Sequence, residues 1–204
     1  LAALSKYAVM FGFDHTSGME LPESDPKISD SDGIRSAIGQ GTHLYTVSQI
    51  ARYVSTIANR GTVYDLTLLD KLTDSEGNTI EDYPSSVYNK MEIADVDWNT
   101  IQEGLHQVAL NTKAFDGLDL TIAGKTGTAQ QTGHANHGLF VGYAPYDDPE
   151  ITIAVRIANG YSSHNAATAA RNVISYYYKE TSMKDIKEMK AAGVNGNTRN
   201  SVAD

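Results

Sequence analysis

The stretch Gly124-Lys125-Thr126-Gly127-Thr128 decides the interpretation of the last third of this 204-residue chain. It closes a short apolar run at 120–128, and two similar runs follow at 138–144 and 151–158, each bounded by turn residues. The connection at 145–149 is too short for the crossover of about a dozen residues that parallel strands need. The sequence therefore predicts three strands, of which the second and third form an antiparallel hairpin.

Helical spacing of apolar residues predicts three helices, at about 46–60, 97–111 and 165–179. Thr46 and Gln49 fit a capping box at the start of the first helix, and Gly61 fits its C-terminal end. The last helix is expected to cover one face of the sheet, which makes the chain an α+β protein. Residues 13–41 are rich in Asp, Ser, Gly and Pro, which predicts a long ordered loop. β-Branched and aromatic residues in 63–72, followed by turn residues at 76–78, predict a hairpin.

The glycine-flanked lysine also invites comparison with a phosphate-binding loop. That motif needs a glycine five positions before Gly124, where this chain has Asp119, whose carboxylate would repel phosphate. A helix should also begin at the lysine, but Gly127 and the residues after it are poor helix formers. The sequence therefore favours a strand at this position.

A lysine beside threonine hydroxyls on a strand edge offers a cation and hydrogen-bond donors to a carboxylate. Gly127 would let another backbone approach closely. These features predict a docking surface for a peptide. Strict alternation places Lys125 and Thr126 on opposite faces of the strand, so we expect a pronounced twist or a bulge if both line one cleft.

Several blocks around this strand resemble the class B, monofunctional penicillin-binding proteins in order and spacing. The resemblance covers about residues 1–179 and rests on the blocks at 5–13, 18–22, 37–41, 57–61, 123–130 and 138–145. It implies the penicillin-binding and serine β-lactamase-like fold, with an antiparallel sheet flanked by helices. Residues 1–180 would be the C-terminal part of a transpeptidase domain, and 181–204 a polar tail that is disordered beyond 193.

The resemblance also implies roles for the strand residues. Lys125, Thr126, Gly127 and Thr128 would bind the substrate; Lys125 and Thr126 would hold the carboxylate of a peptidoglycan stem peptide or a β-lactam. The backbone N–H of Thr128 would form one arm of the oxyanion hole, so Lys125, Thr126 and Thr128 would be catalytic. No metal or organic cofactor is implied.

The nucleophile motif of this family, Ser-x-x-Lys, matches only Ser24 to Lys27, where Pro26 would break the required helical turn. The second motif, Ser-x-Asn, matches only Ser163 to Asn165, which follows the lysine strand and fits a helix N-terminus. We interpret both as chance. The chain is thus expected to be a catalytically inactive piece of a serine-type D,D-transpeptidase that cross-links peptidoglycan.

The net charge of -9 argues against nucleic acid as a partner. Apolar residues at helical spacing from Leu1 suggest that the chain is a segment of something longer. The resemblance implies an extracytoplasmic parent, anchored to the plasma membrane by a segment absent here, within a complex for cell-wall synthesis and cell shape. A β-lactamase, a β-lactam sensor and a non-catalytic scaffold of the same fold remain alternatives.

Two further groups of residues have simple structural interpretations. His134, Asn136 and His137 lie in a glycine-rich loop with no carboxylate at ligand spacing, which favours solvated residues over a metal site. The three tyrosines at 176–178 are expected to pack at the end of the last helix.

Overall fold

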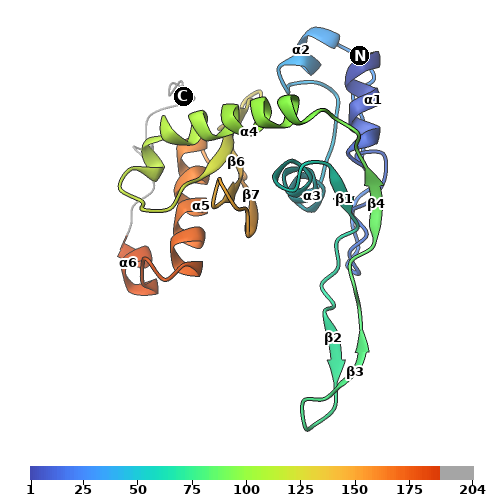
Figure 1. The fold of residues 1–204 in the computed structure, drawn as a ribbon. Helices are drawn as coiled ribbons and strands as arrows, with labels where there is room; N and C mark the ends of the chain where they lie inside the picture. Colours follow the sequence, from blue (N-terminus) through green and yellow to red (C-terminus); the bar gives the residue numbers. More distant parts are fainter. Residues whose placement is uncertain (189–204) are drawn as a thin grey trace. The chain divides into compact units, whose positions relative to one another are not determined.

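A computed structural model describes residues 1–188 of the chain (Figure 1). The chain divides into two compact units, Leu1–Ile93 and Ala94–Asp204. Both helices and antiparallel sheets are present, as the α+β prediction requires. No helix among the described residues combines the length and the apolar character needed to span a membrane.

The first unit contains three helices, α1 (Ala2–Met10), α2 (Gly33–Ala37) and α3 (Val47–Ala58). The predicted capping box of α3 is confirmed, because Thr46 Oγ1 accepts from the Gln49 N–H and Gln49 Oε1 accepts from the Thr46 N–H. At its C-terminal end Gly61 has a positive φ of 114°, as predicted, and Arg60 before it also adopts the left-handed conformation, with φ of 62°. The Gly61 N–H then reaches the Thr56 carbonyl at 2.8 Å, which closes the last turn.

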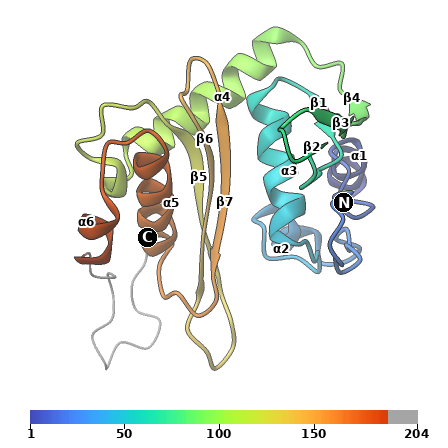
Figure 2. The same ribbon diagram turned by 90° about the horizontal axis from the view of Figure 1, so that it is seen from below.

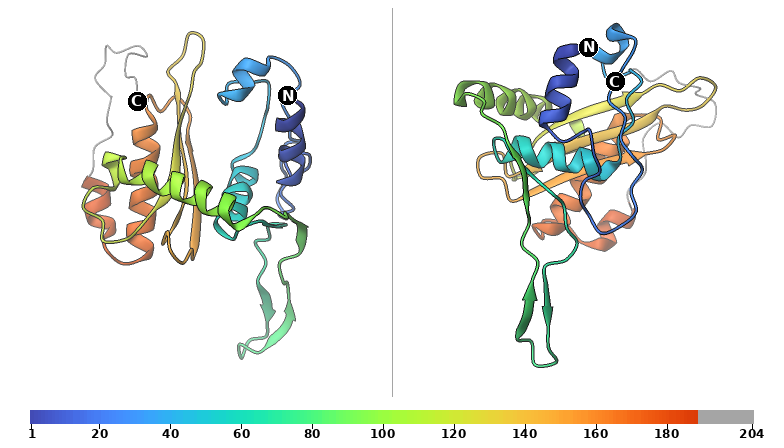
Figure 3. Two further views of the ribbon diagram at one scale, coloured as in Figure 1. Left: turned by 45° about the horizontal axis from the view of Figure 1, so that its top comes forward. Right: turned by 90° about the vertical axis from the view of Figure 1, so that its right-hand side faces the viewer.

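A β-ribbon leaves α3 and extends away from the helices of the same unit (Figures 1 and 3). Its four strands pair as β1 with β4 and β2 with β3, with the bounds β1 Thr62–Tyr64, β2 Lys71–Thr73, β3 Thr79–Asp82 and β4 Val87–Lys90. The turn between β2 and β3 contains 76–78, as predicted. The run 63–72 is not one strand, because Leu66 N–H binds the Ser17 carbonyl and Leu68 N–H binds the Glu20 carboxylate.

The second unit holds the sheet β5-β6-β7, with helices around it (Figure 2). Its strands are β5 (Ala123–Ala129), β6 (His137–Ala144) and β7 (Ile151–Ile157), all antiparallel as predicted. The helical elements are α4 (Asp95–Leu110), the 3₁₀ turn η1 (Lys113–Phe115), α5 (Ser163–Tyr177) and α6 (Met183–Glu188). Ser162 caps α5, since its hydroxyl accepts from the His164 N–H at 3.1 Å.

Helix α5 packs on one face of this sheet and builds the core of the unit. The buried side of α5 consists of small or aliphatic residues (Ala166, Ala167, Ala170 and Ile174). They pack against Phe140, Ile153 and Val155 of the strands. Gly138 allows the closest approach: a Cβ atom there would lie 2.4 Å from the Ser162 carbonyl oxygen. The lack of a side chain at Gly138 therefore allows the N-terminus of α5 to lie close to β6.

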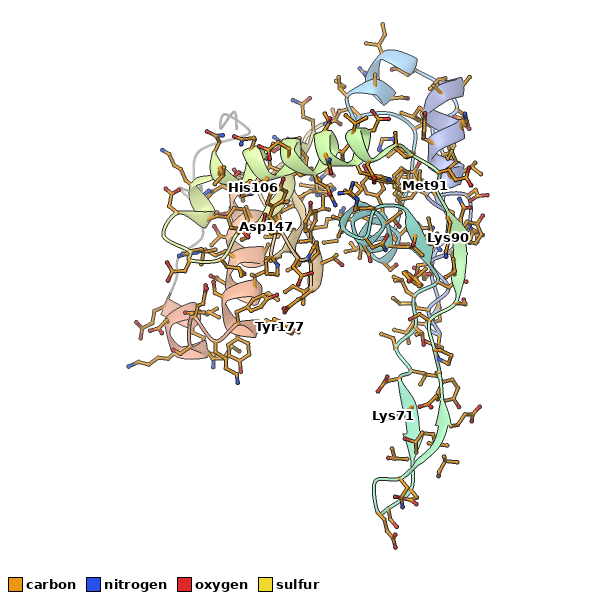
Figure 4. All side chains as sticks on the ribbon, in the orientation of Figure 1. Lys71, Lys90, Met91, His106, Asp147 and Tyr177 are labelled. Carbon is orange, nitrogen blue, oxygen red and sulfur yellow. The ribbon has the colours of Figure 1, made fainter. Side chains whose placement is uncertain are left out.

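Three details depart from the sequence predictions. The loop at 13–41 includes the short helix α2, and Lys27 forms an isolated bridge with Leu44. The packing predicted for the tyrosines is wrong for two of them, because Tyr176 and Tyr177 are 52% and 57% exposed. Figure 4 labels Tyr177 on α5. Residues 189–204 lie outside the described part, so the prediction of disorder beyond 193 remains a prediction.

Candidate active site

The Lys-Thr-Gly stretch lies on β5, at the border of the sheet. Among the described strands β5 pairs only with β6, and the pairing runs without a bulge from Ala123 to Ala129. Lys125 is exposed, and Thr126, Gly127 and Thr128 are partly buried. All four predicted residues thus lie next to one another on an edge strand.

The register shows which faces of β5 carry them. Thr126 pairs with Phe140 and Thr128 pairs with Gly138, so both threonines lie on the side of the sheet that α5 covers. Lys125 pairs with Val141 on the opposite side. No bulge interrupts the pairing, but the lysine side chain is long enough to reach the neighbouring backbone: Lys125 Nζ donates to the Thr126 carbonyl oxygen at 2.8 Å. The ammonium thus lies beside the backbone that carries the two hydroxyls.

The N-terminus of α5 lies beside this part of the sheet. Gly138, the partner of Thr128, is the residue that the Ser162 backbone approaches. The N-terminal end of a helix carries a partial positive charge that favours anions within about one turn. This end of α5 adds to the positive potential of Lys125 near the threonine hydroxyls.

Gly127 has room for a side chain within its own sheet. A Cβ atom there would meet only the Leu139 Cβ, at 3.4 Å, whereas one at Gly124 would lie 2.4 Å from the Phe140 ring. Packing inside the unit therefore requires glycine at 124 but does not require it at 127. The absence of a side chain at Gly127 leaves the outer edge of β5 open to another backbone.

The histidine loop is more ordered than the sequence suggested. Asn136 is buried, and His137 begins β6, where its Nδ1 accepts from the Asn159 N–H at 3.0 Å and its Nε2 lies 2.9 Å from the Arg156 guanidinium. Burial, and then the Arg156 charge, lower the pKa of His137. The prediction of solvated loop residues is wrong for Asn136, which is buried, whereas His137 belongs to a strand but stays partly exposed. Among residues 1–188, no group of three or more His, Asp or Glu side chains is arranged to hold a metal.

The two chance matches to the family's other motifs have structural roles. Lys27 lies in a loop and pairs with Asp30 at 3.0 Å, so Ser24 and Lys27 share no helical turn. Ser163 and Asn165 are buried in the first turn of α5, where Asn165 Nδ2 donates to the Gly160 carbonyl at 2.9 Å. Neither pair presents a nucleophile beside a base.

Known structures share this arrangement of sheet and helices. Penicillin-binding protein 2B of Streptococcus pneumoniae superimposes with a TM-score of 0.75 at 28% identity, over 88% of this chain and 32% of that chain. The fold is that of the penicillin-binding and serine β-lactamase-like proteins, in the branch that forms transpeptidase domains.

Sequence comparison narrows this class to one family. The family model described as "Penicillin binding protein transpeptidase domain" matches residues 1–175. Penicillin-binding protein 2B of Streptococcus pneumoniae is 32% identical over 83% of this chain and 28% of its own length. Peptidoglycan D,D-transpeptidase MrdA of Haemophilus influenzae is 28% identical over 87% of this chain and 33% of its own length. The chain belongs to the penicillin-binding protein transpeptidase domain family, and it spans about a third of these relatives or less.

Proposed function

We propose that this chain is the C-terminal part of the transpeptidase domain of a peptidoglycan D,D-transpeptidase. Family membership supports the reaction class, and the open edge of β5 supports the location of the substrate. The observation that carries the proposal is Gly127: the packing of the sheet does not require glycine there, but a substrate backbone lying against the strand does.

In the proposed reaction a serine outside this chain attacks the carbonyl carbon between the two D-alanines of a stem peptide. The amide bond breaks, the terminal D-alanine leaves as the free amine, and an ester links the remaining peptide to the serine. An amine of a neighbouring strand then displaces the serine and forms the cross-link. A β-lactam would acylate the same serine: the amide bond of its ring breaks, and the amine that forms stays tethered to the acyl group.

Lys125, Thr126 and Thr128 each have one task in this scheme. The stem peptide adds to the edge of β5 as an antiparallel strand, and its terminal carboxylate lies near the hydroxyl of Thr126 and the ammonium of Lys125. The Thr128 N–H holds the oxyanion of the tetrahedral intermediate. One such donor contributes about 2.7–4 kcal/mol to transition-state stabilisation.

Acylation of the full-length protein by a fluorescent penicillin tests these tasks. Thr126→Val keeps the shape of the side chain and removes its hydroxyl, so we expect acylation to slow by about tenfold or more. Thr152→Val on β7 makes the same change elsewhere in the sheet and should leave the rate unchanged. Equal rates for Thr126→Val and the parent would refute the assignment of the carboxylate site.

The 204-residue chain by itself provides a second test. It holds the β5 strand but no nucleophile motif, so it should remain unlabelled after prolonged incubation with the fluorescent penicillin. A covalent label on the chain would show that a nucleophile is present and would contradict the proposal.

The location and partners of the parent follow from its proposed substrate. We propose that it acts outside the cytoplasm, is anchored to the plasma membrane, and works within a complex that builds the wall. Product release separates two of the alternatives from a transpeptidase: a β-lactamase would free the hydrolysed antibiotic rapidly, and a scaffold would form no acyl group, whereas a transpeptidase would keep it. A β-lactam sensor would also keep the acyl group but would not cross-link stem peptides.

A further inference from the structure

A surface cavity of about 330 Å³ lies in the second unit, between α5 and the loop that leads into β5. It is lined by Gly117, Leu118, Asp119, Arg171, Asn172, Ser175, Glu180 and Thr181. None of these residues belongs to the candidate active site. All of them lie within the one compact unit that starts at Ala94.

Two polar atoms at this cavity are buried without a hydrogen-bond partner. They are Arg171 Nε and Ser175 Oγ, which lie one helical turn apart on α5. Ser175 is only 4% exposed, so its hydroxyl is cut off from bulk water. A buried donor or hydroxyl without a partner costs free energy. Water does not reach either atom in this conformation, so an acceptor in the cavity would stabilise both groups after their side chains turn toward it.

Opposite charges line the same cavity without meeting. The Arg171 guanidinium donates to the Asp116 carbonyl at 3.3 Å, and none of the ion pairs within residues 1–188 includes Arg171. Asp119 and Glu180 line the cavity with their negative charges. A cation and two carboxylates held apart around one space suit a ligand that carries both signs of charge.

We propose that this cavity binds a small zwitterion of the α-amino acid class. Its carboxylate would accept from Arg171 and Ser175, and its ammonium group would donate to Asp119 or Glu180. Leu118 offers an apolar contact to a short side chain. The choice of D-alanine as the first probe rests on the proposed function, because that amino acid is the leaving group of the acyl transfer.

Titration of D-alanine, L-alanine and glycine into the 204-residue chain, followed by NMR shifts or calorimetry, tests the proposal. We expect saturable binding in the millimolar range or tighter, as suits so small a ligand. Propionate and ethylamine each carry one of the two charged groups and should bind more weakly. Propionate binding as tightly as D-alanine would refute the zwitterion, and no saturable binding of any amino acid would refute the site.

Ser175→Ala distinguishes a ligand contact from a structural role. It removes an unsatisfied hydroxyl, so the free chain should resist urea as well as the parent or better, while the affinity for the amino acid falls by roughly three- to tenfold. Arg171→Gln should weaken binding by about tenfold or more, and Arg35→Gln, the same change on α2 of the other unit, should not. Unchanged affinity in Ser175→Ala would overturn the assignment.

These measurements need neither a nucleophile nor acylation. Failure to bind amino acids would therefore leave the proposed transpeptidase function standing. Failure of the penicillin experiments would in turn leave the cavity proposal intact, and only the reason for testing D-alanine first would be lost.

Discussion

Two glycines on paired strands should respond in opposite ways to the same substitution. Gly138→Ala would place a Cβ atom 2.4 Å from the Ser162 carbonyl oxygen, against an ordinary contact of 3.4–4 Å. The obstacle is backbone, so α5 must shift by about an ångström. Overpacking of this kind costs about 1–3 kcal/mol of unfolding free energy.

Gly127→Ala is the matched control. Its Cβ atom would meet only the Leu139 Cβ at 3.4 Å, and both substitutions reduce the entropy of the unfolded chain equally. We expect the stability of Gly127→Ala to be unchanged or to rise by up to about 1 kcal/mol. Its effect should appear instead as slower acylation of the full-length protein, because the substrate backbone can no longer approach β5.

Urea unfolding of the 204-residue chain measures the difference in unfolding free energy between Gly138→Ala and Gly127→Ala. Trp98, the single tryptophan, is 2% exposed in α4 of the same unit, so its fluorescence reports the loss of structure there. With a slope of about 2 kcal/mol per molar urea, Gly138→Ala should lower the midpoint by roughly 0.5–1.5 M. An unchanged midpoint for Gly138→Ala, or an equal loss for Gly127→Ala, would refute the packing argument.

Two more predictions concern the cap of α3 and the end of α5. Thr46→Ala removes the capping hydroxyl and should cost about 1 kcal/mol of unfolding free energy, measured by far-UV circular dichroism in urea, while Thr100→Ala inside α4 should cost nothing. Burial, with the hydrogen bond to Glu150, raises the pKa of Tyr178 from 10.0 to about 12. Since the folded state suppresses this ionisation, its contribution is complete below pH 10 and is lost as the pH rises through about 12. Tyr178→Phe should therefore show a shallower loss of stability over that interval, and identical alkaline curves would contradict the assignment.

Family membership was accessible from the sequence because the motifs are contiguous. The blocks around Lys125 and at 138–145 need no knowledge of distant contacts, and the comparisons confirm the family they indicated. The arrangement of the site was less accessible. Which faces of β5 carry Lys125, Thr126 and Thr128 depends on the pairing with β6, and this pairing contains no bulge.

Local chemistry in the sequence by itself determined the cap of α3 and the antiparallel β6-β7 hairpin, because a capping box spans four positions and a five-residue connection excludes a crossover. Only the tertiary structure decided that Tyr176 and Tyr177 face solvent, that Gly138 meets α5, and that Arg171 and Ser175 share a cavity. Each of these depends on the packing of elements distant in the sequence, which helical periodicity and residue type alone do not predict.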